Sequence, residues 1–396
     1  MTDTALTPVR RGWPRAPEDS LLASVLLSFL ATAGLFYVNI MAALVDGLTS
    51  GAGLTARQAG FVASANVYGA AVGALAAVFI IRRAPWRPTA VVVLLSLIVV
   101  DLGSILLTSA EVLIAARFVH GFIGGLLVGV AFAVIARTKS PDRTFGMLLV
   151  VQFGLGGLGL MFLPRLTPVF GHGVLFLALA AFSAATLAMT PFLGDYRPAT
   201  PAAPGAVRAP IRWRPLALVF GAIFLFQAAN MGLAAYIIGL GKASGLKLGF
   251  ITDTLGAANW IGALGSVLVV ALGVKFGRAG PLLAGLALTL AGTWAFHFSD
   301  APWIFLAANI GTAITWAFVI PYLLGMCAAF DGAGQMAALG GFFSKMGLAS
   351  GPAVAAVVAG DGRYGPLIDL AVFGLVLSGA ASIAPALALD RQRPQA

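Results

Sequence analysis

The sequence predicts an all-α polytopic membrane protein with twelve transmembrane helices, and its composition is the first reason. Of its 396 residues, 60% are hydrophobic and 10% are charged, whereas roughly 25% of the residues of an ordinary globular chain are charged. A soluble surface cannot be built from so few polar residues without large apolar patches. The solvent around this chain must therefore be lipid, which a helix of about 20 apolar residues can span.

The second reason is that twelve apolar runs of sufficient length follow one another along the chain. The first is too long for the hydrophobic region of a cleavable signal peptide, so it predicts a retained helix. Only Gly171 to Gly173 separate the fifth run from the sixth, and Pro164 and Arg165 support a turn there. The predicted spans are 21–45, 58–81, 89–107, 112–135, 144–163, 174–193, 215–240, 249–272, 281–298, 302–326, 334–357 and 366–389.

One long polar stretch, residues 194–214, divides these spans into two groups of six. We expect an N-terminal bundle over 21–193 and a C-terminal bundle over 215–389, with a central loop over 194–214 and tails over 1–20 and 390–396. Such a division is typical of two bundles related by an internal repeat, with a substrate path between them near the bilayer midplane. The alternative is a single irregular bundle with a flexible loop.

The basic residues predict the orientation, because Lys and Arg accumulate in cytoplasmic loops. With the N-terminus inside, seventeen of the 24 fall on the cytoplasmic side and five on the other, which leaves only Arg117 and Lys345 within the membrane. The net charge of +10 is therefore a topology signal and does not indicate nucleic-acid binding. We expect an integral protein of the bacterial cytoplasmic (inner) membrane, with the central loop and both tails in the cytoplasm.

Two short basic loops occupy equivalent positions in the two halves. The loop Gly273-Val274-Lys275-Phe276-Gly277-Arg278 resembles the cytoplasmic Asp-Arg-x-Gly-Arg turn of the major facilitator superfamily, with Val274 in place of the acid. Residues 81–88 keep the basic residues of that turn but lack its acid and glycine. The resemblance covers nearly the whole chain. It implies two six-helix bundles of the major facilitator type and secondary transport by alternating access, not enzymatic catalysis.

The start of the fourth span, residues 116–125, resembles the Arg-x-x-x-Gly helix motif of proton-coupled members, with His120 where a Gln is often found. Arginine in the bilayer costs at least ~2.5–3.5 kcal/mol, so we expect Arg117 to face the interior and to have a partner. Asp46 is the best candidate by depth. Asp101 is less suited, because the resemblance implies that the third span packs outside the cavity, as it usually does in this superfamily. Asp46, Arg117 and His120 are therefore the predicted proton-coupling residues. The alternatives are an Arg117 that reaches water at the outer boundary and a solvated Asp46.

Lys345 is the other costly residue, because it lies in the middle of the eleventh span without an acid nearby. A wet cavity, a distant acid or an anionic substrate would explain it. Polar and aromatic residues of the seventh and tenth spans share helix faces, and two more lie in the first span. The predicted substrate-binding residues are Lys345, Gln227, Asn230, Asn309, Thr312, Trp316, Tyr37 and Asn39.

Other ligand classes have no support in the sequence. Residues 154–159 match a dinucleotide-binding glycine pattern, but they lie in an apolar run without the required strand. Glycines in such runs, like Gly69/Gly73, Gly121/Gly125 and Gly347/Gly351, allow helices to approach closely. The single Cys327 excludes a disulfide and a Cys-based metal site. We therefore expect neither a cofactor nor a metal.

Two classes of function remain. The first is a proton-coupled secondary transporter of a small organic solute, which the basic residues in the membrane indicate to be anionic. A drug or metabolite exporter is the alternative within this class, although the Gly-Pro motif of such exporters is not met in the fifth span. The second class is a non-transporting sensor on a transporter scaffold. The expected partners are a small-molecule substrate, protons and membrane lipid, and the expected state is a monomer.

Overall fold

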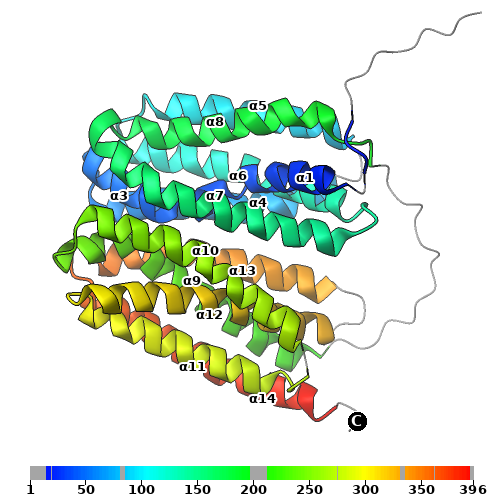
Figure 1. Ribbon diagram of the computed structural model, residues 1–396, viewed down its shortest axis with the longest axis vertical. Coiled ribbons are helices and arrows are strands. Elements are labelled where there is room, and N and C mark those ends of the chain that lie inside the picture. The colour runs from blue at the N-terminus through cyan, green and yellow to red at the C-terminus, as the bar shows by residue number, and fades with distance from the viewer. Residues whose placement is uncertain are drawn as a thin grey trace, which may run out of the picture.

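The helices of the protein form two bundles that lie side by side (Figure 1). The computed structural model describes residues 15–18, 20–80, 85–196, 212–273, 275–330, 335–360 and 362–392, and these contain helices but no strands. Most of the predicted tails and central loop lies outside the described residues. The start of α1 (Leu21–Ala33) and the end of α14 (Gly365–Asp390) lie at the same end of the molecule (Figure 1). We name this end the termini side and the opposite end the far side.

The bounds of most elements lie within a few residues of the predicted spans. The first bundle consists of α1 (Leu21–Ala33), α2 (Phe36–Asn39), α3 (Met41–Gly51), α4 (Ala56–Ile80), α5 (Trp86–Ser104), α6 (Ala110–Ile135), α7 (Pro141–Phe170), α8 (Gly173–Met189) and the 3-10 turn η1 (Thr190–Phe192). The second consists of α9 (Trp213–Ala243), α10 (Leu248–Leu272), α11 (Ala279–Ala295), η2 (Phe296–Phe298), α12 (Pro302–Ala329), α13 (Gln335–Val358) and α14 (Gly365–Asp390).

Eleven helices in the described part of the chain are long and apolar enough to cross a membrane. The twelfth crossing is the first predicted span, which the structure divides into α1, α2 and α3. The prediction of twelve spans in two six-helix bundles is therefore confirmed. The chain is an integral membrane protein.

The interruption of the first span occurs at Gly34, where α1 crosses α6. A Cβ atom at Gly34 would overlap the backbone carbonyl of Gly124 and the side chain of Val128, so only glycine allows the two backbones to approach this closely. Leu35 and Ile40 then leave regular helical geometry on either side of the one-turn helix α2. Interrupted membrane helices of this kind are tolerated where the backbone lies within protein or beside a cavity.

The predicted end of the fifth span at residue 163 is wrong, because α7 continues as a helix through Pro164 to Phe170. A proline removes one backbone hydrogen bond, but membrane helices tolerate this loss when neighbouring helices support them. The chain turns at Gly171, within the predicted gap between the fifth and sixth spans, and the positive φ of 74° at this residue suits a residue without a side chain. Arg165 remains within the helix and reaches across to α10.

Small residues form the closest helix contacts, as predicted. Gly69 of α4 lies against the backbone of α6, and Gly121 of α6 lies against the carbonyl of Asn66. In the second bundle, Gly347 and Gly351 of α13 lie against the backbone of α9. Close backbone approach gives each of these helix pairs extensive van der Waals contact, which is a principal driving force for association in lipid.

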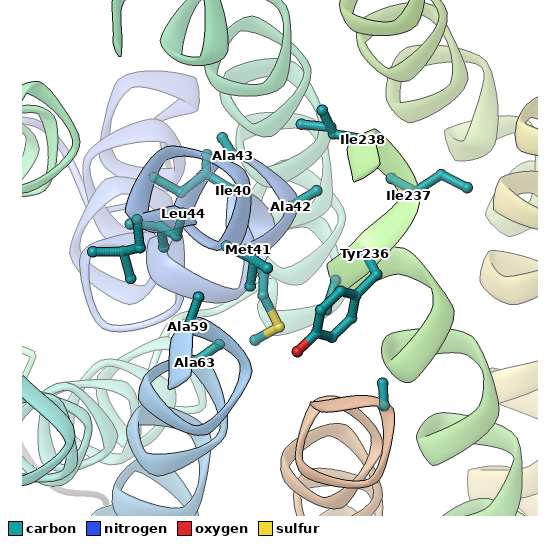
Figure 2. Close-up of a cluster of buried hydrophobic side chains, with 14 of the residues drawn as sticks. Ile40, Met41, Ala42, Ala43, Leu44, Ala59, Ala63, Tyr236, Ile237 and Ile238 are labelled. Atoms are coloured by element: carbon teal, nitrogen blue, oxygen red, sulfur yellow. The ribbon is translucent and has the colours of Figure 1, made fainter. Parts of the chain in front are cut away.

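The buried apolar residues form three clusters, and their distribution shows where the bundles meet. One cluster belongs to the first bundle alone and another to the second bundle alone, and both include the segments near the termini side. The third combines residues of both bundles. Figure 2 shows part of it, with Met41 of α3 directed toward Tyr236 of α9 and beside Ala59 and Ala63 of α4. The bundles therefore share an apolar core toward the far side.

Polar contacts also join the two bundles at the far side and keep it closed. Asp46 of α3 accepts a hydrogen bond from Lys242 of α9 at 2.5 Å, and the Tyr236 hydroxyl donates to the carbonyl of Ala56 at 2.7 Å. Arg165 of α7 forms an ion pair with Asp253 of α10. These contacts join the bundles, so opening the far side requires breaking them.

Asp46→Asn is expected to favour opening of the far side, because the amide cannot form the ion pair with Lys242. Partly exposed pairs contribute up to about 1 kcal/mol, so the population of open molecules should rise roughly two- to fivefold. The measurement is the labelling rate of Ala59→Cys by a membrane-impermeant maleimide, in a background where Cys327 is replaced by Ala. Asp300→Asn, which alters a carboxylate without a described ion pair, is the control. Equal labelling of both variants would show that the pair does not hold the far side closed.

Candidate functional site

A cavity of about 500 Å³ lies between the two bundles. Its walls come from the interrupted first span, from α4 and α7 of the first bundle, and from α9, α10, α12, α13 and the α11–η2 segment of the second. This volume falls in the range of small-molecule sites, and a position between bundles is typical of such sites. The predicted binding residues that line it are Asn39, Gln227, Asn230, Asn309, Thr312, Trp316 and Lys345.

Lys345 is the only basic residue among the described residues that line the cavity, and no acidic residue lies among them. Within the described part of the chain, no carboxylate lies within ion-pair distance of Lys345 and no hydrogen-bond partner contacts it. A charged ammonium group in such a place needs water or an anion to balance it. The cavity therefore presents a single uncompensated cationic group.

A hydrogen-bonded chain of side chains links three helices beside Lys345. The Trp316 indole N–H of α12 donates to Gln227 Oε1 of α9 at 2.7 Å, and Gln227 Nε2 donates to the Ser344 hydroxyl of α13 at 2.7 Å. Gln227 is 2% exposed, so little water competes for these bonds. These two hydrogen bonds hold the indole of Trp316 in a fixed position relative to the segment of α13 that carries Lys345.

The amide side chains of the cavity use their NH2 groups on backbone carbonyls. Asn230 donates to Phe226 at 2.8 Å and Asn309 to Phe305 at 2.7 Å, each one turn earlier in its own helix. Asn39 donates to the carbonyl of Gln152 across to α7. These bonds leave the amide oxygens as the groups that can accept from a bound solute.

Arg117 lies in a second site, a cluster of polar side chains inside the first bundle. We name it the Arg117 cluster, and it consists of Asn66, Asp101, Ser104, Arg117 and His120. Arg117 donates to Asp101 at 2.7 Å and to the Ser104 hydroxyl, and its guanidinium and the carboxylate are both fully buried. The ring of Phe176 lies 4.8 Å from the guanidinium carbon, which suits a cation–π contact.

The predicted pairing of Asp46 with Arg117 is wrong. Arg117 points toward α5 and pairs with Asp101, whereas Asp46 pairs with Lys242 at the far side. The helix α5 does pack outside the cavity, because none of its residues lines it. However, Asp101 and Ser104 lie three residues apart on one face of α5 and point into the bundle rather than toward lipid. The position of a helix outside the cavity therefore did not predict the direction of its acidic side chain.

The hydrogen bonds of the cluster define the protonation state of His120. Asn66 Nδ2 donates to the carbonyl of Arg117 at 3.2 Å, and a carbonyl can only accept, so the amide orientation is set. The same Nδ2 lies 2.7 Å from His120 Nδ1, which must therefore accept as well. The histidine proton is then on Nε2, 3.2 Å from Asp101. A neutral His120 thus lies between Asn66 and the Asp101–Arg117 ion pair.

An added proton would therefore disturb the Arg117 cluster. Protonation of Asp101 would remove the charge that pairs with Arg117, and protonation of His120 at Nδ1 would place two donors against each other. Either event changes a contact that joins α6 to α4 or α5. The cluster can therefore link a protonation event to the packing of the first bundle.

Tyr37 was predicted to line the substrate path, but the structure places it elsewhere. It is 2% exposed, it does not line the cavity, and its ring centroid lies 6.0 Å from that of His120. Its hydroxyl has no hydrogen-bond partner among the described residues. Because α2 is a single turn between two interruptions, Val38 and Asn39 face the cavity while Tyr37 faces α6.

Two contacts of the second bundle were not predicted. Trp260 of α10 donates to the carbonyl of Gly154 at 3.1 Å and packs over Gly157, so the glycine-rich segment of α7 makes room for an aromatic side chain. At the termini side, Asp390 of α14 accepts from the backbone of Arg278 and Ala279 at the start of α11. This cap supplies an acid to the basic turn that lacks one in sequence.

Comparisons with known proteins identify the fold. No protein-family model matches the sequence, and no curated protein sequence matches it either. A crystal structure of the nucleoside transporter NupG is similar to this chain with a TM-score of 0.68 and 14% identity over 93% of this chain and 98% of that one. A crystal structure of a D-xylose-proton symporter is similar with a TM-score of 0.66 and 14% identity over 94% and 98%. The chain therefore has the fold of the major facilitator superfamily.

Proposed function

We propose that this protein is a proton-coupled secondary transporter that moves a small organic anion across the cytoplasmic membrane by alternating access. The observation that carries the proposal is the unpaired Lys345 in a cavity between two bundles. The similar structures support the transport class, since both are named as transporters of small solutes and one is named as a proton symporter. An orientation with the termini in the cytoplasm, which the basic residues favour, would place the closed far side at the outer surface of the membrane.

The charge of the cavity supports an anionic solute. As the bundles close around a solute, water leaves and the local dielectric constant falls, so the attraction between Lys345 and a carboxylate strengthens. A lipophilic cation, the usual solute of a drug exporter, would meet the opposite effect. The closed state therefore favours anions over cations.

The Arg117 cluster supports proton coupling. Asp101, Arg117 and His120 lie within a buried network, where gain of a proton must break or replace a strong contact. Tyr37 connects this network to the cavity. Its ring centroid lies 6.0 Å from that of His120, and the next two residues in the chain, Val38 and Asn39, line the cavity. The protonation state of Asp101 and the shape of the cavity wall can therefore depend on each other. Asp46 has no part in this scheme, because it lies in the far-side contact with Lys242.

Transport in proteoliposomes tests the proposal. With an imposed proton gradient, we expect a radiolabelled monocarboxylate to accumulate, and we expect a protonophore to abolish the accumulation. The neutral amide of the same acid and a lipophilic cation serve as matched solutes. Equal accumulation of all three, or accumulation only of the cation, would contradict the proposal.

A further inference from the structure

The inference that follows rests on the proposed function and concerns the chemical class of the solute. We propose that the solute is a planar aromatic monocarboxylate, with its carboxylate at Lys345 and its ring against Trp316. Three features of the cavity support this assignment: its single charge, the state of the Trp316 indole, and the apolar surface around both.

The charge of the cavity favours one carboxylate over two. Lys345 is the only charged residue among the described residues that line it, so a monoanion leaves the occupied cavity neutral. A dicarboxylate would bring a second negative charge into a cavity with no further cation in its described wall, and an unpaired buried charge is costly. A solute without charge would leave Lys345 unpaired.

The indole of Trp316 is a surface for an aromatic ring. Its N–H is already bonded to Gln227 at 2.7 Å, so the indole has no donor left for the solute and offers only carbon and π surface. The Gln227–Ser344 bond connects this indole to the turn of α13 that carries Lys345. Phe153 of the opposite bundle meets Trp316 edge-to-face, with ring centroids 6.4 Å apart and an interplanar angle of 77°. A third ring adjoining this pair would have favourable aromatic geometry.

Most of the remaining wall is apolar, apart from the few side-chain amide oxygens described above, and therefore favours an apolar body over a polyhydroxylated one. Met231, Ile237, Leu255 and Leu348 line the cavity and cannot bond hydroxyl groups. Several solute hydroxyls against such a wall would lose water without replacement hydrogen bonds. A flat apolar ring has no hydroxyl groups that need such bonds. It would also contact both bundles through Phe153 and Trp316, so its presence can favour their closure.

Four probes separate these features in binding measurements on the purified full chain. Benzoate is the aromatic monocarboxylate, cyclohexanecarboxylate has the same charge without the π system, benzamide has the ring without the charge, and phthalate has a second carboxylate. We expect benzoate to bind about fivefold more tightly than cyclohexanecarboxylate, as aromatic contacts of this kind provide. Phthalate and benzamide should each bind at least roughly tenfold more weakly than benzoate.

The variants then assign the preference to Trp316. Trp316→Leu should bring the ratio of benzoate to cyclohexanecarboxylate affinity close to one, and Trp316→Phe should keep most of the ratio if the leucine variant folds poorly. Trp303→Leu is the matched control, since Trp303 lies on the same helix, is 70% exposed and does not line the cavity. A wild-type ratio near one, or a ratio that Trp316→Leu leaves unchanged, overturns the aromatic assignment.

The same measurements keep this inference distinct from the proposed function. If both carboxylates bind in a manner that depends on Lys345 but without preference for the ring, the anion transporter stands and the aromatic class is wrong. If neither carboxylate binds at millimolar concentration, the aromatic monocarboxylate is wrong, and the anion transporter is decided by the accumulation assay above. If phthalate binds more tightly than benzoate, the solute is a dianion and the assignment to a monocarboxylate is overturned.

Discussion

Lys345→Gln is expected to weaken the binding of carboxylate solutes by roughly 30-fold or more and to leave the binding of their neutral amides nearly unchanged. The glutamine keeps much of the length of the side chain but removes the only charge in the described wall of the cavity. Loss of one partner from a buried, hydrogen-bonded charge pair costs about 2 kcal/mol or more, which corresponds to that change in Kd. The measurement is calorimetric titration with a carboxylic acid and its amide.

Two further variants make this result specific. Lys345→Arg should retain part of the carboxylate affinity, because the charge remains while the planar guanidinium alters the geometry. Lys247→Gln is the matched control, since Lys247 is exposed at the start of α10 and does not line the cavity. If Lys345→Gln leaves the ratio of acid to amide affinity unchanged, Lys345 has a structural role and the anionic substrate should be abandoned.

Removal of the charges of Asp101 and Arg117 is expected to abolish proton-driven accumulation while exchange of solute persists. Asp101→Asn alone leaves Arg117 buried without a counter-charge, which costs about 3–5 kcal/mol and can prevent folding. The double variant Asp101→Asn, Arg117→Gln removes both charges and keeps polar side chains in their places. It should fold, but it cannot carry a proton at Asp101.

Two assays on the double variant separate coupling from structure. Counterflow exchange in proteoliposomes reports solute movement without a proton gradient, and it should stay within about an order of magnitude of wild type. Accumulation driven by the gradient should fall to the level of empty vesicles. Asp300→Asn, a change of an exposed acid outside the cluster, should affect neither. Accumulation at the wild-type level in the double variant would exclude the Arg117 cluster as the coupling site.

The partner of Arg117 shows what kind of information sequence reasoning lacked. Burial of Arg117 followed from the cost of an arginine in lipid, and the structure confirms that it is fully buried. Its partner was chosen by depth along the span, which favoured Asp46. The stronger signal was that Asp101 lies well inside a span and needs a partner for the same energetic reason, whereas Asp46 near a span end can meet another polar group.

Tyr37 and Asn39 show a second limit. They were assigned to the same path because both lie in the first span, but the interruption at Gly34 and Ile40 turns Tyr37 toward His120 and Asn39 toward the cavity. The interruption depends on the contact between Gly34 and Gly124 of another helix. No pattern within the first span alone contains that contact.

The sequence alone determined the solvent, the number of spans, the division into two bundles and the residues too costly to leave in lipid. These properties depend on local composition and on the fixed thickness of a bilayer, so they can be derived one segment at a time. The tertiary structure alone decided which costly residues pair, as in Asp101–Arg117, and which stay unpaired, as Lys345 does. Pairing depends on the rotation of each helix about its own axis. That rotation is set by close contacts with neighbouring helices, such as Gly121 of α6 against Asn66 of α4, and therefore by residues far apart in the chain.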